Sequence, residues 1–462
     1  MNNESSVRRL AWFSPMPPVP TGIAACSGDL VPALGRAYAI DVYVDEPAVA
    51  QDAGRYSAHD FLWRHRRTPY DLVVYQLGNS SHHDYQWPYL FHFPGLAVLH
   101  DAHLHHARAA ALLRTDRASA YRAEFAAAEP DASADAAELA VAGFDNYLYY
   151  TWPMTRLVVA ASRLTAVHTP RAADQLRMWV PGAAVEHIRL GHGHQLGPAE
   201  AHDARRRIRG RHDIADDAVL FGCFGALTPD KRVPQILKAF SAVLPYAPSA
   251  RLLLAGAAAA HYDVAPDIAA NGLQPQVIRT GYLESDAEMT DHIAACDVTL
   301  NLRWPTAREV SGPWLRCLAA GKATIVTDMS HIDVPSLDPR TWTAHLAPAP
   351  LLDDGRTSSA PICVAIDIVD EDHSLRTAMR RLACDAALRA ALGGAAAAWW
   401  AREHTPDGML DDYRRIIERA VALPAPKPEL PPHLVDDGAG RVRALLQGFA
   451  LPNPLDREPR CV

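Results

Sequence analysis

The chain has 462 residues, of which 49% are hydrophobic and 21% charged, and its formal net charge at pH 7 is −8. This length exceeds what one hydrophobic core usually serves, so we expect two domains, and the negative charge gives no electrostatic case for a nucleic-acid partner. Seven scattered cysteines without a CxxC pair favour a reducing cytoplasm over a disulfide framework or a zinc module. Prolines interrupt the N-terminal segment early and no long apolar run follows, so we expect neither a secretory signal nor a membrane span.

The first half alternates predicted strands with helical segments. The expected strands lie at residues 9–14, 40–44, 71–77, 95–99, 164–168 and 185–190. This alternation is typical of parallel crossover units and predicts a doubly wound α/β sheet. A proline-rich loop after the first strand ends in Gly22 and a helix, where a glycine would let the backbone approach a phosphate closely, although a simple turn also explains it.

Four histidines and an aspartate lie between His100 and His106, directly after the fourth of these strands. Imidazole and carboxylate groups suit zinc or iron, so a metal site is one interpretation. Three of the histidines fall at a predicted helix start, however, where they would point in different directions, so we expect no metal. We favour the interpretation that His100 and Asp101, at the end of a strand, face a ligand cleft. The aromatic run at residues 144–152 indicates core packing more than a pocket lining.

The second half restarts the alternation at residue 218. Its first unit has a glycine turn at Gly225, followed by Lys231 and Arg232 where a helix begins. The helix macrodipole disfavours cations at that end, and a bound diphosphate would remove the conflict. A solvated charged turn is the alternative.

A strand at residues 298–302 then leads into a turn that contains Glu309, Ser311 and Gly312. Ligands of open parallel sheets lie outside the carboxyl ends of the strands, where helix N-termini present free N–H groups to anions. A carboxylate at this position can hold vicinal sugar hydroxyls while nearby amides hold a phosphate. Capping of the next helix explains Glu309 equally well.

The C-terminal part is predicted to be helical. Its alanine-rich segment indicates two helices that are broken at Gly393 and Gly394, and an amphipathic helix follows at residues 408–421. The proline run after that helix predicts an extended connector.

Taken together, several segments resemble the GT-B glycosyltransferases of family 4, which are retaining enzymes that use nucleotide-sugar donors. The likeness covers most of residues 9–420, and its segments occur in the family's order: TGIA, YDLVVYQLGNS, PGLAVLHD, FGALTPDKR, LLLAG, TGYLESDAEMTDHIAACDVTLNLRWPT and EVSGPWLRCLAAGK. The resemblance implies two facing Rossmann-like doubly wound domains. The expected divisions are an acceptor domain at 1–195, a linker at 196–216, a donor domain at 217–400, a helix that crosses back at 401–422, and a proline-rich tail at 423–462.

The resemblance also implies roles for individual residues. Lys231 would bind the donor diphosphate with Arg232 beside it, Glu309 would contact hydroxyls of the donor sugar, and His100 would approach that sugar from the first domain. The implied catalytic residues are Glu309, Lys231 and His100, and the implied donor-binding residues are Gly22, Gly225, Lys231, Arg232, Glu309, Val310, Ser311 and Gly312. Asp101 and Cys317 are further candidates.

Two positions depart from the family pattern. Cys317 stands where the family usually has a second glutamate that holds the ribose, and Ala226 stands where many members have an arginine. A thiol cannot accept hydrogen bonds from ribose hydroxyls as a carboxylate can. We therefore expect the nucleotide to be bound more weakly or by other groups, with Arg232 as a source of the missing charge.

Three functions follow from these observations. The first is a retaining glycosyltransferase of the hexosyltransferase type, without metal or other cofactor, acting on a glycan or glycolipid acceptor in polysaccharide or glycolipid assembly. The second is a catalytically silent partner protein that binds a sugar nucleotide, and the third is a metal-dependent hydrolase built on the His100–His106 cluster. We expect a cytoplasmic protein, and the resemblance leaves peripheral contact with the inner face of the membrane open, although no strongly basic amphipathic helix argues for it.

Overall fold

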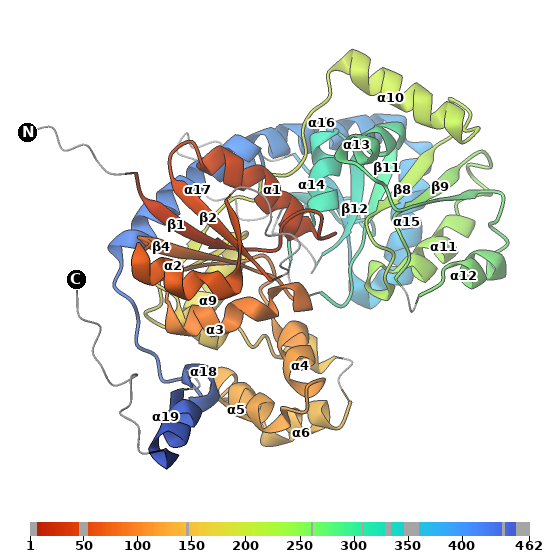
Figure 1. The fold of residues 1–462 in the computed structure, drawn as a ribbon. Coiled ribbons are helices and arrows are strands. Elements are labelled where there is room, and N and C mark those ends of the chain that lie inside the picture. The colour runs from red at the N-terminus through yellow and green to blue at the C-terminus, as the bar shows by residue number, and fades with distance from the viewer. Residues whose placement is uncertain are drawn as a thin grey trace, which may run out of the picture.

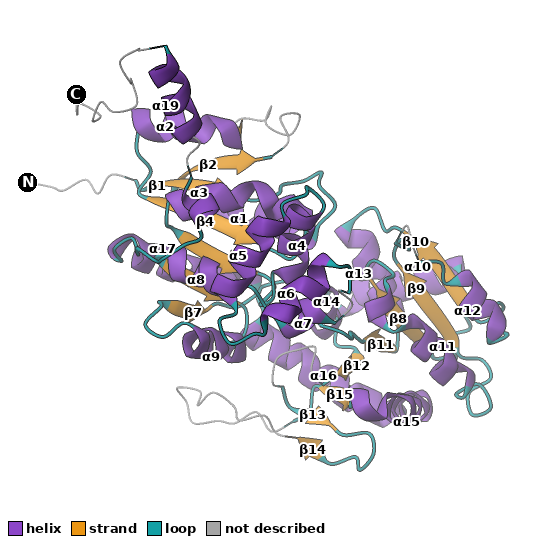
Figure 2. Ribbon diagram, turned by 90° about the horizontal axis from the view of Figure 1, so that it is seen from below, coloured by secondary structure: helices purple, strands orange, loops and turns teal. Residues whose placement is uncertain are grey.

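The computed structural model describes residues 7–45, 54–144, 147–259, 262–306, 309–328, 334–345, 360–436 and 439–449. These residues form two β-sheets, each flanked by helices, and the two units lie side by side (Figures 1 and 2). The architecture confirms the predicted α/β class with two doubly wound sheets.

The first sheet is parallel throughout, with the strand order β3-β2-β1-β4-β5-β6-β7. Its strands are β1 (Arg9–Phe13), β2 (Ala39–Val44), β3 (Arg55–Ser57), β4 (Leu72–Leu77), β5 (Leu96–Leu99), β6 (Leu164–Val167) and β7 (Val185–His187). The helical segments of this unit are α1 (Gly22–Leu34), η2 (Ala58–Asp60), α2 (Phe61–Arg67), η3 (Ser81–Gln86), α3 (Trp87–His92), α4 (His105–Leu113), α5 (Ala118–Ala128), α6 (Ala134–Val141), α7 (Leu148–Thr151), α8 (Arg156–Ala161) and α9 (Pro170–Trp179).

The second sheet has the order β10-β9-β8-β11-β12-β15-β13-β14 and is parallel except for the last pair. Its strands are β8 (Leu220–Phe224), β9 (Arg251–Ala255), β10 (Val277–Gly281), β11 (Val298–Asn301), β12 (Ala323–Thr327), β13 (Ser336–Leu337), β14 (Ala344–His345) and β15 (Cys363–Ile366). The helical segments are α10 (Pro198–Arg211), η4 (Pro229–Lys231), α11 (Val233–Ser241), α12 (Ala265–Ala270), α13 (Asp286–Ala295), α14 (Gly312–Ala319), η5 (Ile368–Asp370), α15 (Glu371–Cys384), α16 (Ala386–Glu403), α17 (Pro406–Ala422), α18 (Pro432–Val435) and α19 (Ala439–Gly448).

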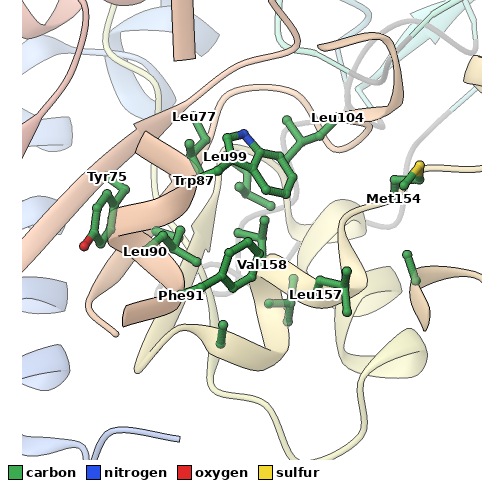
Figure 3. Close-up of a cluster of buried hydrophobic side chains, with 14 of the residues drawn as sticks. Tyr75, Leu77, Trp87, Leu90, Phe91, Leu99, Leu104, Met154, Leu157 and Val158 are labelled. Atoms are coloured by element: carbon green, nitrogen blue, oxygen red, sulfur yellow. The ribbon is translucent and has the colours of Figure 1, made fainter. Parts of the chain in front are cut away.

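The central strands of both sheets are buried on both faces. All six residues of β4, LVVYQL, and all five of β8, LFGCF, are buried. Helices cover each face of a parallel sheet, so its central strands read as continuous apolar runs rather than as alternating ones. Figure 3 shows part of the apolar layer between the sheet and helices α3 and α8, where Leu77 of β4 lies near Leu99 of β5 and Trp87 of α3.

Helix α17 returns from the second sheet to the first, as Figure 1 shows. The Tyr413 hydroxyl lies 3.3 Å from Gln76 Oε1 of β4, and the Tyr413 ring lies 5.9 Å from that of Trp12 in β1. Asp412 accepts hydrogen bonds from the backbone N–H and the guanidinium of Arg189, at 2.9 and 2.8 Å. The last long helix is therefore fastened to the first sheet by both apolar and charged contacts.

The predicted helix break at Gly393 and Gly394 is wrong. Helix α16 runs through both glycines, and the break lies instead at Asp385, whose side chain accepts a hydrogen bond from Leu388 N at 2.9 Å. Gly393 has a packing role, because a Cβ there would stand 2.1 Å from the carbonyl oxygen of Gly321. The glycine is needed so that α16 can approach the turn after α14.

The segment that we expected to be an interdomain linker, residues 196–216, contains helix α10. This helix packs along α13, and Arg207 forms an ion pair with Asp291 at 2.5 Å. The expected domain boundaries stay predictions. Within the described ranges, no helix is both long enough and apolar enough to span a membrane.

Candidate active site

A cavity of about 330 Å³ lies between the loops of the two sheets. It is lined by loops that follow the carboxyl ends of β1, β4, β5 and β11, together with the segment after β7. The lining residues are Thr21, Gly22, Ile23, Cys26, Asn79, Ser80, His83, His100, Asp101, Leu190, His192, Arg303, Glu309, Val310, Ser311, Gly312 and Pro313. Seven of the predicted site residues thus meet here, namely Gly22, His100, Asp101, Glu309, Val310, Ser311 and Gly312.

Two helix N-termini face this cavity. Helix α1 begins at Gly22, where Thr21 Oγ1 accepts a hydrogen bond from Ala24 N at 3.0 Å. Helix α14 begins at Gly312, where Ser311 Oγ accepts one from Trp314 N at 3.3 Å. Threonine and serine are preferred caps, which explains locally why both helices start at these positions. The free N–H groups and the macrodipole at each end favour an anion in the cavity.

The carboxylate of Glu309 is held in one orientation by two neighbours. Arg303, directly after β11, places Nε 2.6 Å from Glu309 Oε1, and Thr306 donates a hydrogen bond to Oε2 at 3.0 Å. Arg303 also donates to Asp230 Oδ2 at 2.9 Å. A carboxylate that is fixed in advance loses less conformational entropy when it accepts hydroxyl hydrogen bonds.

His100 belongs to a hydrogen-bonded chain that reaches α17. Its Nε2 lies 2.8 Å from Gln76 Oε1, and its Nδ1 lies 3.3 Å from His168 Nε2. Because Gln76 Oε1 can only accept, His100 Nε2 carries a proton and Nδ1 accepts from His168. Burial and the neighbouring His168 hold the pKa of His100 well below its usual 6.5. His100 is therefore neutral at pH 7, and both of its ring nitrogens are bonded within the protein.

Asp101 brings a second carboxyl group to the cavity. Its Oδ2 accepts a hydrogen bond from Asn79 N at 2.7 Å. Burial, followed by the negative charge of Glu309, raises the pKa of Asp101 to about 7, although Asn79 and Arg303 act against this. A substantial fraction of Asp101 is therefore protonated at neutral pH, which lets it donate as well as accept.

Lys231 lies beside the turn after β8 and does not line the cavity. Its ammonium donates a hydrogen bond to Phe224 O at 2.5 Å, and burial, then Arg303, lowers its pKa. Gly225 has a φ of +90°, and a Cβ there would stand 3.0 Å from Lys231 Nζ. The backbone conformation favours glycine at this position, and a larger residue would also crowd the ammonium.

Arg232 does not line the cavity either. Its guanidinium forms a bidentate ion pair with Glu371, at 2.8 and 2.5 Å, and its backbone is left-handed with a φ of 60°. This charge is therefore neutralised inside the second unit. Arg303, which the sequence analysis did not select, is the arginine that the structure places at the cavity.

Cys317 is completely buried on the sheet side of α14. Thr299 and Asn301 of β11 hydrogen bond to its sulfur, and burial raises the pKa of the thiol to about 12. The cavity lining does not include this residue.

The histidines after His100 have separate partners. His105 bonds to Trp152 O at 2.7 Å and to the Tyr121 hydroxyl at 2.8 Å, whereas His106 Nδ1 lies 3.2 Å from Asn79 Nδ2. In the part of the chain that the structure describes, no three histidine, cysteine or acidic side chains come together as metal ligands. The metal-dependent hydrolase therefore lacks the converging ligand set that it would need there.

No protein-family model matches the chain, and no curated protein matches it significantly. Solved structures do resemble it. Sucrose-phosphate synthase (tll1590) from Thermosynechococcus elongatus has 13% identity and a TM-score of 0.57, over 89% of this chain and 98% of that one. Anabaena Alr3699/HepE in complex with UDP has 12% identity and a TM-score of 0.56, over 89% and 100%. WaaG, a glycosyltransferase involved in lipopolysaccharide biosynthesis, has 13% identity and a TM-score of 0.55, over 89% and 99%.

The chain has the GT-B fold. At these identities the likeness establishes the fold alone, so membership of family 4 stays a prediction. The GT-B arrangement accounts for the position of the cavity, since ligands of doubly wound sheets bind at the carboxyl ends of the strands.

Arg303 and His192 are among the cavity residues that the sequence analysis did not select. Arg303 had a usable signal, because a cation directly after a buried strand lies at the ligand edge of a parallel sheet. The local sequence contained no signal for His192, because this residue lies in the segment between the two sheets and not in a loop between a strand and its helix. The His192 ring leaves no room for a side chain at position 312, because a Cβ on Gly312 would stand 2.8 Å from His192 Cδ2. Burial, then Arg316, lowers the pKa of His192 to about 4, so this ring is neutral at pH 7.

Proposed function

We propose that this protein is a glycosyltransferase that moves a sugar from a nucleoside-diphosphate sugar to a hydroxyl group of a glycan or glycolipid acceptor. The observation that carries this proposal is the cavity in which the oriented carboxylate of Glu309 lies beside the N-terminus of α14. The GT-B neighbours support it, since the Anabaena protein was crystallised with UDP and with UDP-glucose.

In this proposal each group of the site meets a different part of the donor. Glu309 accepts hydrogen bonds from sugar hydroxyls, and the amides of Val310, Ser311 and Gly312 bind a phosphate. Negative charge grows on the departing diphosphate, so fixed donors aimed at it stabilise the transition state more than the ground state. Lys231 lies outside the cavity lining but close enough to Arg303 and Glu309 to interact with their charges. In the proposal it reaches the diphosphate from behind these residues, because an ammonium has three N–H donors and its bond to Phe224 leaves others for a phosphate oxygen.

The stereochemical course is part of the proposal. We propose that the sugar is transferred with retention, with the leaving phosphate accepting the acceptor's proton on the same face of the ring. The anomeric configuration of the product, read by NMR spectroscopy before it equilibrates, tests this point. An inverted product would contradict it.

The test of donor binding is a screen of the purified protein against UDP-, GDP- and ADP-sugars by thermal shift, followed by calorimetry. One nucleotide class should stabilise the protein. Loss of a hydrogen bond to a charged phosphate is worth about 1.5–3 kcal/mol, so Lys231→Ala should weaken binding roughly 10- to 100-fold. The matched control is Lys238→Ala, which removes an exposed ammonium from α11 and should leave affinity unchanged.

Turnover is tested with Glu309→Gln, which keeps the shape of the side chain and removes its charge. Its control is Glu138→Gln on α6, which removes an exposed carboxylate outside the cavity. Loss of transfer only in the first variant supports the site. Normal transfer by Glu309→Gln, or no binding of any nucleotide sugar, would overturn the proposal. Binding by the wild-type protein with no turnover on any acceptor would favour the catalytically silent partner instead.

A further inference from the structure

A second and larger cavity, of about 650 Å³, lies in the first unit between α3, α4 and α18. Figure 1 shows these helices below the first sheet, where the chain returns after α17. Three parts of the chain form its walls: the η3–α3 segment, α4 with the turn that follows it, and α18. Its volume falls in the range of small-molecule sites.

A buried charge cluster holds these walls together. Glu124 of α5 is fully buried and accepts two hydrogen bonds from Arg108 of α4, both at 2.5 Å. The same carboxylate lies 2.7 Å from His433 Nε2 of α18. The Arg108 guanidinium also lies over the Trp87 ring of α3, 4.4 Å from its centroid.

Burying these charged groups costs desolvation free energy, and apolar side chains of similar size would fill the same space without that cost. The cluster does fix all three walls relative to one another. A cavity with fixed walls is ready to bind a ligand without first being ordered.

The walls present complementary polar groups. Arg114 and Arg117 are exposed on the α4–α5 turn, and neither guanidinium forms an ion pair with a residue in the described ranges. Asp84 lies on the η3 wall, and its Oδ1 is buried without a hydrogen-bond partner among the described residues. Burial raises the pKa of this carboxyl to about 6, against the effect of Arg108. Asp436 adds another carboxylate on the α18 wall.

The simplest alternative is that Arg114 stands at the end of α4 only because the macrodipole favours a cation there. The macrodipole does not explain Arg117, which precedes α5. It also does not explain why Asp84 on the facing wall has a carboxylate oxygen without a hydrogen-bond partner among the described residues. Arginine pairs bind carboxylate and phosphate oxygens in a bidentate manner, and carboxylates accept hydrogen bonds from sugar hydroxyls.

We propose that this cavity binds an acidic saccharide, with its carboxylate or phosphate on Arg114 and Arg117 and its hydroxyls toward Asp84.

The second cavity shares elements with the first. Segment η3 contributes His83 to the first cavity and Asp84 to the second, and α4 begins shortly after Asp101. The nine residues of α4 span about 14 Å at 1.5 Å per residue. If the protein is the glycosyltransferase proposed above, the saccharide in the second cavity is a remote part of the acceptor glycan. The binding of an acidic saccharide does not itself rest on that function. Remote binding of this kind adds energy that can be used at the reacting centre.

The test is calorimetry on the full chain at low salt with four probes: tetragalacturonate, glucose 6-phosphate, neutral maltotetraose and inorganic phosphate. The first two separate a carboxylate from a phosphate as the anionic group. At least one should bind, and Arg114→Gln/Arg117→Gln should weaken that binding tenfold or more. The control is Arg66→Gln/Arg67→Gln on α2, which removes the same charge from another exposed pair and should leave affinity unchanged.

Three results would overturn the proposal: no binding of either acidic saccharide, equal weakening in both double variants, or inorganic phosphate or maltotetraose binding as tightly as the acidic saccharides. The Lys231→Ala variant separates the two sites. It should weaken nucleotide binding and leave saccharide binding unchanged, so failure of the donor assignment and failure of the second site give different results.

Discussion

The two adjacent glycines of α16, Gly393 and Gly394, should differ in their effect on stability when each is replaced by alanine. A Cβ on Gly393 would stand 2.1 Å from Gly321 O and 3.0 Å from its carbonyl carbon, whereas a Cβ on the exposed Gly394 would meet nothing within 4 Å. Both substitutions by alanine gain the same helix propensity, about 1 kcal/mol. The difference between the two variants therefore isolates the cost of pushing α16 away from the turn after α14.

Overpacking against a backbone that cannot rotate away costs about 1–3 kcal/mol. Gly394→Ala should thus raise the unfolding temperature, and Gly393→Ala should lie about 1–3 kcal/mol below it. For a unit of about 200 residues this corresponds to a gap of about 2–12 °C. Thermal unfolding followed by circular dichroism and by calorimetry measures it. Equal stability of the two variants would refute the packing argument and show that α16 and this turn adapt freely.

Three further predictions concern buried polar groups. The pKa of Asp101 is raised in the folded state, so the unfolded chain binds fewer protons there and this residue lowers the stability of the protein as the pH rises from about 4 to 7. Asp101→Asn should therefore gain stability relative to wild type over that interval, as measured by thermal unfolding at each pH. Gly225→Ala forces a Cβ into a backbone with a φ of +90° and next to Lys231, and should cost about 1–2 kcal/mol and weaken nucleotide-sugar binding in calorimetry. Arg209→Leu removes the buried guanidinium that contacts Asp297 at 2.7 Å and leaves the Ala218 carbonyl without this donor, and should cost about 1–3 kcal/mol in urea unfolding.

The controls for these three variants lie on α10, at exposed positions. Asp203→Asn should have the same dependence of stability on pH as the wild type. Gly210→Ala should be neutral or mildly stabilising, because nothing lies near its Cβ. Arg206→Leu should change the free energy of unfolding little, because its ion pair is exposed. Parallel pH curves for Asp101→Asn and wild type would contradict the raised pKa. Full nucleotide affinity in Gly225→Ala would show that this turn does not contact the donor. A loss below about 1 kcal/mol in Arg209→Leu would show that Arg205, which also pairs with Asp297 at 2.9 Å, compensates for the missing guanidinium.

Much of the fold follows from local sequence. The central strands of both sheets are continuous apolar runs separated by helix signals, and that pattern specifies parallel α/β units because strands covered on both faces have no polar side. The starts of α1 and α14 could also be located, because Thr21 and Ser311 act within three residues of themselves. The candidate cavity residues Gly22, His100 and Glu309 followed from their positions in the loops after predicted strands.

The misjudged features depend on groups that are distant in sequence. Gly393 indicated a helix break because its local propensity is poor, but its function is to let α16 meet Gly321, 72 residues earlier, at close range. Arg232 looked like a free cation at a helix start, and its partner Glu371 is 139 residues away. No window of local sequence contains such a pair.

The sequence by itself determined which segments become strands and helices and which loops face the cleft, because these depend on burial patterns and caps within a few residues. Only the tertiary structure decided which charges meet. It placed Arg303 rather than Arg232 at the cavity and buried Cys317 on the sheet side of α14. Electrostatic and packing contacts act through space at a few ångströms, so residues that are far apart in the chain acquire their roles only when the sheets bring them together.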